Sequence, residues 1–303
     1  MARDDDRGAP APLSAPRAPP RDTRGLERAL GDFVRARLPP VPAEFLMFGL
    51  KMGWAALFGG LLLAALLVSR ALWQADWPVA RYDAMLAFAL ATQAIFLRFR
   101  LETWDEAKVI LLFHLTGTGM EWFKVAAGSW SYPEPGLFKL LDVPLFSGFM
   151  YASVGSFMAR AIRIFGMRFA PFPPLAAHAG LAVLIYVNFF AHHFLPDARL
   201  ALFAATVALY LRTRVWFTVA RRPLWMPLPL AAFLSSVFLW VAENVGTGTG
   251  TWLYAGQSVF DPVRLSKLGS WYLLLYVSFA TVLLVQRDAL SRRALTADEA
   301  RQR

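Results

Sequence analysis

The amino-acid sequence predicts an all-α membrane protein, a polytopic bundle of about eight transmembrane helices. The first observation is composition: 57% of the 303 residues are hydrophobic and 17% are charged, with a mean hydropathy of +0.44. Average globular chains are about 45–50% apolar and about 25% charged. The second observation is that the apolar residues gather in continuous runs, most of them about as long as a membrane-crossing helix. Because the runs do not alternate apolar and polar residues, they favour helices over an outer-membrane barrel.

The amino-terminal segment, residues 1–43, precedes the first apolar run. It is rich in Pro, Ala, Arg and Asp and contains no run that could serve as a signal peptide. We therefore expect a disordered, basic cytoplasmic tail. Within it, residues 26–38 follow an amphipathic pattern, which fits either a helix on the membrane surface or a fraying linker helix.

A membrane domain is predicted over residues 44–287, followed by a second cytoplasmic tail at 288–303. The second apolar run is short for a full span. The predicted runs lie at 44–69, 82–97, 108–127, 143–165, 174–195, 198–219, 227–247 and 266–286.

Arg and Lys residues predict the orientation of these helices, because such residues are retained on the cytoplasmic side of a membrane. With the amino terminus inside, the cytoplasmic loops carry more Arg and Lys than the outer loops, and both tails are basic. We therefore expect a multi-pass protein of the plasma membrane with both termini in the cytoplasm. The formal net charge of +10 has the same origin, so nucleic acid is not expected as a partner.

An internal duplication is predicted from residues that recur at a fixed offset of 122. An offset that covers four spans preserves the direction of the chain, so repeat one (44–165) and repeat two (166–287) should be parallel. The pairs that carry this prediction are Glu121 and Glu243, Gly128 and Gly250, Trp130 and Trp252, and Tyr132 and Tyr254.

Glu121 and Glu243 are the strongest candidates for chemistry. An ionisable group inside an apolar span is costly, which makes it a functional hypothesis by default. Burial would suit either carboxyl group to act as a general acid or as a proton carrier. The alternative is structural: each Glu accepts a hydrogen bond from a nearby Trp or Tyr, or Glu121 pairs with Lys124.

Four aromatic residues, Trp130, Tyr132, Trp252 and Tyr254, follow the two Glu residues at equal spacing. Interfacial Trp and Tyr side chains usually anchor a protein in the membrane interface. Their fixed distance from the two Glu residues favours a second role, in which the rings hold an apolar or cationic substrate.

Histidine and asparagine residues complete the predicted site. His114 lies two helical turns before Glu121 on the same face, and His192 ends the fifth run; either could relay protons or simply pack. Asn188 shares a helix face with His192, and Asn244 directly follows Glu243; we count both among the substrate-binding residues. No metal site is predicted, because adjacent histidines point in different directions and no diagnostic spacing occurs.

Several classes of chemistry are excluded or not expected. The sequence has no cysteine, which rules out disulfides, zinc–thiolate sites, iron–sulfur clusters and a cysteine nucleophile. No dinucleotide fingerprint or phosphate-binding loop occurs, and we expect no cofactor. The oligomeric state is left open.

Longer motifs resemble a known family. Residues 105–114, 121–135, 143–153, 187–194 and 240–245 are similar to a bacterial integral-membrane family of unknown function, typified by the Bacillus YoaT protein. The resemblance covers residues 44–287 and implies a bacterial inner-membrane location, but no catalytic residues. A Glu followed by glycines and a Gly-x-Trp-x-Tyr segment also resembles membrane carotenoid hydratases and small lycopene cyclases, which implies acid chemistry on long polyenes.

These observations lead to three hypotheses about function. The first is an intramembrane enzyme that acts on an isoprenoid or another lipid, with one of the two Glu residues as acid or base. The second is a proton-coupled transporter or permease, which paired repeats and intramembrane acids also fit. The third is a non-catalytic membrane scaffold in which both Glu residues are structural.

Overall fold

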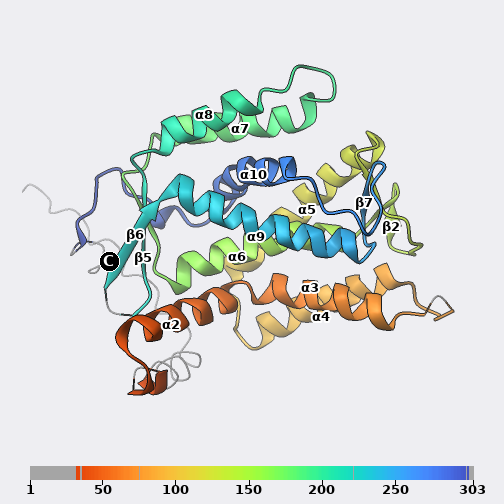
Figure 1. Ribbon diagram of the computed structural model, residues 1–303, viewed down its shortest axis with the longest axis horizontal. Coiled ribbons are helices and arrows are strands. Elements are labelled where there is room, and N and C mark those ends of the chain that lie inside the picture. The colour runs from red at the N-terminus through yellow and green to blue at the C-terminus, as the bar shows by residue number, and fades with distance from the viewer. Residues whose placement is uncertain (1–31, 35, 75, 221, 298, 300–303) are drawn as a thin grey trace, which may run out of the picture.

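The structure, a computed structural model, describes residues 32–34, 36–74, 76–220, 222–297 and 299. Most of the predicted tail at 1–43, and much of the amphipathic segment at 26–38, lies outside these described residues. The first helix named in Figure 1, α2, begins at Pro40, inside the predicted tail.

Helices account for most of the described chain. They are α2 (Pro40–Ala55), α3 (Leu57–Leu72), α4 (Arg81–Arg98), α5 (Trp104–Ala126), α6 (Phe146–Ile164), α7 (Leu175–Ala191), α8 (Arg199–Tyr210), α9 (Leu228–Gly248), α10 (Ser266–Leu283) and a short 3-10 helix at Arg287–Ala289.

Short strands lie at the two ends of the helical body (Figure 1). The strands are β1 (Trp130–Ser131), β2 (Lys139–Leu140), β3 (Val143–Pro144), β4 (Arg168–Ala170), β5 (Arg214–Thr218), β6 (Pro223–Pro227) and β7 (Leu253–Tyr254). At one end, β4, β5 and β6 form an antiparallel sheet in which Trp216 pairs with Trp225. At the other end, β1 pairs with β7 and β2 pairs with β3, also antiparallel.

The helices are stacked in layers, as Figure 1 shows. Helices α7 and α8 pack together along one side, and α3 and α4 pack together along the opposite side. Between them lie α5, α6, α9 and α10, with α5 against α6 and α9 against α10. Helices α2 and α3 are bent by 72° at the break between them.

The prediction of eight spans in two parallel four-helix repeats is wrong. Among the described residues, only α9 is long and apolar enough to cross a membrane by itself, and the bent pair α2 and α3 adds at most one more span. Helices α2, α3, α7 and α8 have 16, 16, 17 and 12 residues, fewer than the 20 or so that a span needs. The run predicted at 198–219 divides into α8 and strand β5.

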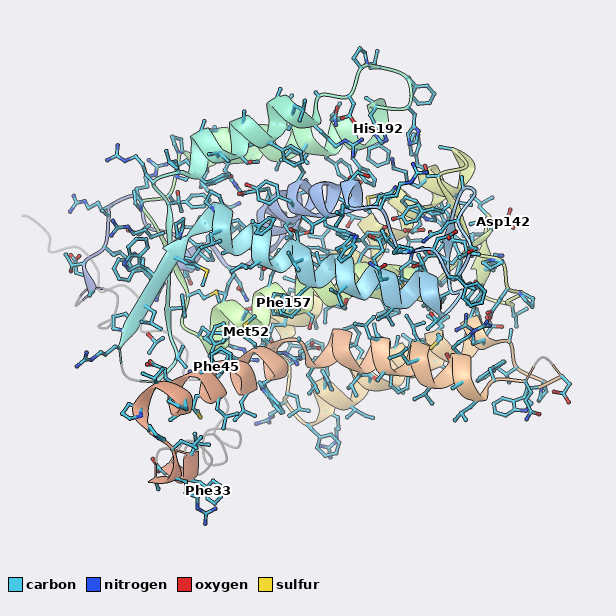
Figure 2. The ribbon with its side chains drawn as sticks, in the orientation of Figure 1. Phe33, Phe45, Met52, Asp142, Phe157 and His192 are labelled. Carbon is cyan, nitrogen blue, oxygen red and sulfur yellow. The ribbon has the colours of Figure 1, made fainter. Side chains whose placement is uncertain are left out.

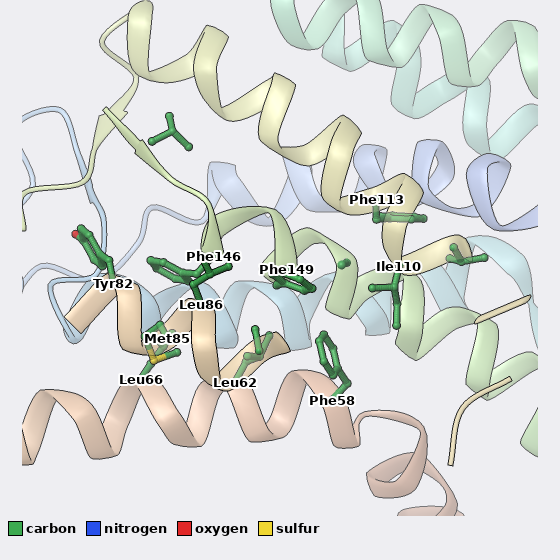
Figure 3. Packing of buried hydrophobic residues seen from close by; sticks show 14 of the residues in the cluster. Phe58, Leu62, Leu66, Tyr82, Met85, Leu86, Ile110, Phe113, Phe146 and Phe149 are labelled. Carbon is green, nitrogen blue, oxygen red and sulfur yellow. The ribbon is translucent and has the colours of Figure 1, made fainter. Parts of the chain in front are cut away.

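The physical reason is that hydropathy counts apolar residues wherever they lie. Many of them pack inside this fold instead of facing outward. The largest buried cluster joins α3, α4, α5 and α6, with Phe58, Tyr82, Phe113, Phe146 and Phe149 among its members (Figure 3). An apolar run therefore predicts a helix well, but it does not separate a lipid-facing helix from an internal one.

Ion pairs join α5 and α6 at the end of the molecule near α2. Glu102 and Arg160 form a salt bridge of 2.7 Å with both side chains fully buried, and Glu106 binds Arg163 at 2.7 Å. Glu106 also closes a capping box with Thr103, which starts α5. Glu102 lies in the connection before α5, so these ion pairs fix the start of α5 against α6.

Candidate functional site

A large cavity extends along the helical body. Its volume is about 1170 Å³, and its lining is mainly apolar. Helix α9 contributes one continuous face, from Leu228 through Ser235 and Leu239 to Glu243, at the three- and four-residue spacing of a helix. At about 1.5 Å per residue, this face is about 22 Å long.

The two ends of the cavity differ in chemistry. Phe45, Met52 and Phe157 line the end near α2, where Figure 2 shows them close together. His192, at the end of α7, lines the opposite end. Between these ends the wall is almost entirely aliphatic and aromatic, so only the end near His192 offers a cluster of polar contacts.

Glu121 lies at the polar end and is 2% exposed. Its carboxylate accepts hydrogen bonds from Trp130 Nε1 at 2.7 Å, from the Tyr132 hydroxyl at 2.8 Å and from the Tyr151 hydroxyl at 2.6 Å. Two of these donors follow α5 in the β1 segment, and the third comes from α6. One buried carboxylate therefore joins a helix, a strand and a neighbouring helix.

Glu243 occupies a similar position on α9. Its carboxylate accepts hydrogen bonds from the hydroxyl of Tyr254 and from Nε1 of Trp271. Tyr254 lies eleven residues after Glu243, the same spacing that separates Tyr132 from Glu121. The structural alternative for the two Glu residues, in which nearby Trp and Tyr side chains donate to them, is thus present at both sites.

Strands β1 and β7 bring the two aromatic segments together. Trp130 pairs with Tyr254 in the strand register, and their ring centroids are 5.8 Å apart, edge to face. Trp252 packs over Gly246, where a Cβ atom would lie 1.7 Å from the indole ring. Glycine at this position therefore lets the Trp252 ring approach the backbone of α9 closely.

The two phenols are strong hydrogen-bond donors at neutral pH. Burial raises the pKa of Tyr132 and of Tyr254 above the ordinary value, and the adjacent Glu carboxylate raises each pKa further. Both hydroxyls therefore keep their protons and bind the carboxylates as donors.

The structure places most, but not all, of the predicted site residues at the cavity. Eight of them line the cavity or its polar end: Glu121, Glu243, Trp130, Tyr132, Trp252, Tyr254, Asn188 and His192. Two do not line it, His114 and Asn244. The catalytic and binding roles assigned to them from sequence stay predictions.

His114 and Asn244 make contacts typical of packing residues. The His114 ring lies 4.4 Å from the ring of Phe149, centroid to centroid. Asn244 donates to the carbonyl of Trp240 and accepts from the backbone N–H of Val263, at 2.7 and 2.9 Å. The His114 contact ties α5 to α6, and the hydrogen bond from Val263 ties α9 to the segment before α10, whereas the bond to Trp240 lies within α9.

Tyr151, Trp271, Lys124 and Lys267 are site residues that sequence reasoning did not assign to the site. Tyr151 and Trp271 complete the hydrogen bonds of the two Glu residues from α6 and α10. A polar aromatic side chain in an apolar helix needs a partner for its O–H or N–H, and this signal could have identified both. Lys124 and Lys267 line the same cavity.

The described part of the chain contains no group of three or more His, Asp or Glu side chains placed to hold a metal ion. His192 Nδ1 donates to the backbone carbonyl of Asn188, 3.0 Å away. Its neighbour His193 contacts Lys124.

Comparison with known proteins places this chain in a family. A model described as a protein of unknown function, DUF817, matches residues 44–279. The uncharacterized protein YoaT of Bacillus subtilis (strain 168) is 40% identical over 240 residues, which cover 79% of this chain and 90% of that protein. No solved structure matches. These matches do not support the resemblance to carotenoid hydratases and lycopene cyclases. The chain belongs to the DUF817 family of proteins of unknown function.

Proposed function

We propose that this protein lies in the bacterial plasma membrane and binds the apolar chain of a lipid or isoprenoid in its cavity. The observation that carries this proposal is the cavity of about 1170 Å³, apolar along α9 and polar only near the two Glu residues. Pockets that bury most of a ligand are typically apolar with a few polar groups that orient it. A long molecule with one polar end fits such a lining.

The outer surface supports a membrane location. Large apolar side chains outside the cavity lining are exposed on several helices, among them Leu72, Leu115 and Leu184, which are between 60% and 63% exposed. Extended exposed apolar surface marks contact with a membrane or with another protein. Helix α9, on which Val241 is 50% exposed outside the cavity lining, is the one helix of the described chain that is long and apolar enough to cross a bilayer by itself.

Glu121 and Glu243 have a positioning role in this proposal. Each carboxylate holds indole and phenol groups that form the polar end of the cavity. The ring faces of Trp130 and Tyr254 can then contact the ligand without competing for the carboxylate.

Filling the cavity tests the binding proposal. We expect Ala242→Trp to weaken binding of oleyl alcohol at least about tenfold, because the indole would occupy the cavity beside Glu243. Val241→Trp is the matched control, since Val241 is the preceding residue of α9, is 50% exposed and does not line the cavity. Native mass spectrometry of the purified full chain in a neutral detergent would count bound oleyl alcohol.

Two results would contradict the proposal: no adduct on the parent protein, or equal loss of the adduct in both Trp variants. Ser235→Phe adds a smaller obstruction to the same wall. It keeps the test valid should Ala242→Trp fail to fold, which a parallel thermal unfolding measurement would reveal.

A second candidate function is acid–base chemistry on the bound lipid at Glu243. This residue lines the cavity and has two hydrogen-bond donors, whereas Glu121 has three. Glu243 thus has the greater capacity to take up a further proton or substrate contact. Transport and a purely structural role stay predictions.

The test of catalysis is a lipid profile of cells. A deletion strain restored with Glu243→Gln should accumulate a precursor and lack its product, whereas a strain restored with Asp105→Asn should resemble the parent. Asp105→Asn is the matched control because it makes the same carboxyl-to-amide change at an exposed site that does not line the cavity. Identical profiles for all strains at equal protein abundance would refute catalysis at Glu243 and leave the binding proposal intact.

A further inference from the structure

Cationic side chains gather at the polar end of the cavity, beside the two Glu residues. They come from three separate parts of the fold: the last turn of α5, the first residue of α8, and the segment that leads into and begins α10. The Lys and Arg residues that line the cavity are Lys124, Arg199, Arg264 and Lys267.

Lys124 is the most buried of these cations, at 2% exposed. Its Nζ donates to the carbonyl of Phe189 at 2.6 Å and contacts Nε2 of His193 at 2.9 Å. Within the described chain it forms no ion pair with a carboxylate. A buried charge without a counter-ion is costly, so this arrangement indicates that a negative charge is supplied from outside the chain.

His193 does not supply that negative charge, nor does it add a positive one at neutral pH. Desolvation and the nearby charge of Lys124 hold its pKa below the usual range for histidine. The ring is therefore neutral, and Nε2 can accept the hydrogen bond from Lys124.

Lys267 and Arg199 face the same space from two other elements. Nζ of Lys267 lies 3.9 Å above the ring of Tyr254, and this lysine has no ion-pair partner among the described residues. Arg199 pairs with Asp197 and also donates to the hydroxyl of Ser270 at 3.3 Å. The lining holds four Lys and Arg side chains against two carboxylates, so positive charge is in excess.

The start of α10 adds polar groups and positive charge to the same end of the cavity. Ser266, Lys267 and Ser270, from its first two turns, all line the cavity. The first turn of a helix carries partial positive charge. The N–H groups of Lys267 and Leu268 already donate to the carbonyls of Arg264 and Leu265, so the side chains, and not these N–H groups, are the donors for an anion. The lysine ammonium groups and the hydroxyls of Ser266 and Ser270 form a surface suited to several oxygen atoms of one anion.

We propose that this cluster binds the phosphate headgroup of a lipid whose chain lies in the cavity. The inference rests on the proposed function and names the ligand class for the same site. A phosphate offers more acceptor oxygens and more charge than a carboxylate, which matches cations that approach from three elements. The apolar wall begins directly beside the cluster, which favours a headgroup attached to a chain over a free ion.

The experiment compares four probes on the purified full chain in a neutral detergent, by titration with native mass spectrometry. The probes are oleyl phosphate, oleyl alcohol, oleate and inorganic phosphate. Lys267→Met removes one cation from a partly exposed position, and Arg264→Met is a second variant at an exposed position. Lys108→Met is the matched control, since it removes the same charge from a surface site of α5 outside the cavity.

We expect oleyl phosphate to bind at least about tenfold more tightly than the other three probes. Lys267→Met should weaken the binding of oleyl phosphate by about tenfold and change the affinity for oleyl alcohol by less than about twofold. Lys108→Met should bind both as the parent does.

Each alternative result overturns a different statement. Equal binding of oleyl phosphate and oleyl alcohol would refute the phosphate headgroup site but leave the proposal of lipid binding in the cavity intact. If oleate binds as tightly as oleyl phosphate, the site does not select phosphate and a carboxylate headgroup takes its place in the proposal. If inorganic phosphate binds as tightly as oleyl phosphate, the cluster binds a free anion and not a lipid headgroup. Failure of every long-chain probe would refute the proposed function itself.

Discussion

Glu121→Leu is expected to lower the free energy of unfolding by about 4 kcal/mol or more. The substitution leaves Trp130 Nε1 and the hydroxyls of Tyr132 and Tyr151 without their acceptor. Each buried donor without a partner costs about 1–3 kcal/mol, and whole domains are stable by only about 5–15 kcal/mol. The polar end of the cavity should therefore lose its order first. Denaturant unfolding of the purified protein in detergent measures the change.

Two further variants separate hydrogen bonding from charge. Glu121→Gln keeps one carbonyl oxygen that can accept, so we expect it to lose only about 1–2 kcal/mol. Asp105→Asn removes a carboxylate from the exposed side of α5 and should change stability by less than about 0.5 kcal/mol. If Glu121→Leu unfolds at the same denaturant concentration as Asp105→Asn, the three hydrogen bonds do not stabilise the site.

Arg160→Met should destabilise the protein by about 3–5 kcal/mol, because it leaves the carboxylate of Glu102 buried without its counter-ion. Glu102 would retain only neutral donors, Gln93 at 2.6 Å and Ser156 at 2.9 Å. The double variant Arg160→Met, Glu102→Gln should regain most of the loss, since no buried charge remains. The surface variant Lys108→Met provides the comparison and should lose less than about 1 kcal/mol.

The stability of the Arg160→Met variant should also depend on pH. Burial already raises the pKa of Glu102, and loss of Arg160 removes the charge that lowers it. The folded variant therefore binds a proton more tightly than the unfolded chain, and its stability falls as pH rises through that raised pKa. Its deficit relative to the parent should be smaller near pH 5 than near pH 8. An equal deficit at both values would show that Glu102 does not carry the effect.

The sequence alone determined the position of most helices and identified several residues at the polar end of the cavity, although the run at 198–219 contains a strand and His114 and Asn244 do not line the cavity. Glu121 and Glu243 were predicted as candidates for chemistry because an ionisable group within an apolar run is costly, and the nearby Trp and Tyr residues were the donors of the structural alternative. Trp130, Tyr132 and Tyr254 do make those contacts or form the adjoining wall. These are local relationships, within about a dozen residues along the chain, so spacing was enough to find them.

Only the tertiary structure decided the features that depend on distant segments. It showed that the apolar runs are not eight spans, because hydropathy does not reveal which apolar faces pack against one another. It brought Tyr151 and Trp271 from other helices to the two Glu residues, and it joined Lys124 to Lys267 at one cavity. It also placed His114 on Phe149, away from the cavity lining. A helix face predicted from sequence specifies a direction, whereas the neighbour in that direction is set by how the helices pack.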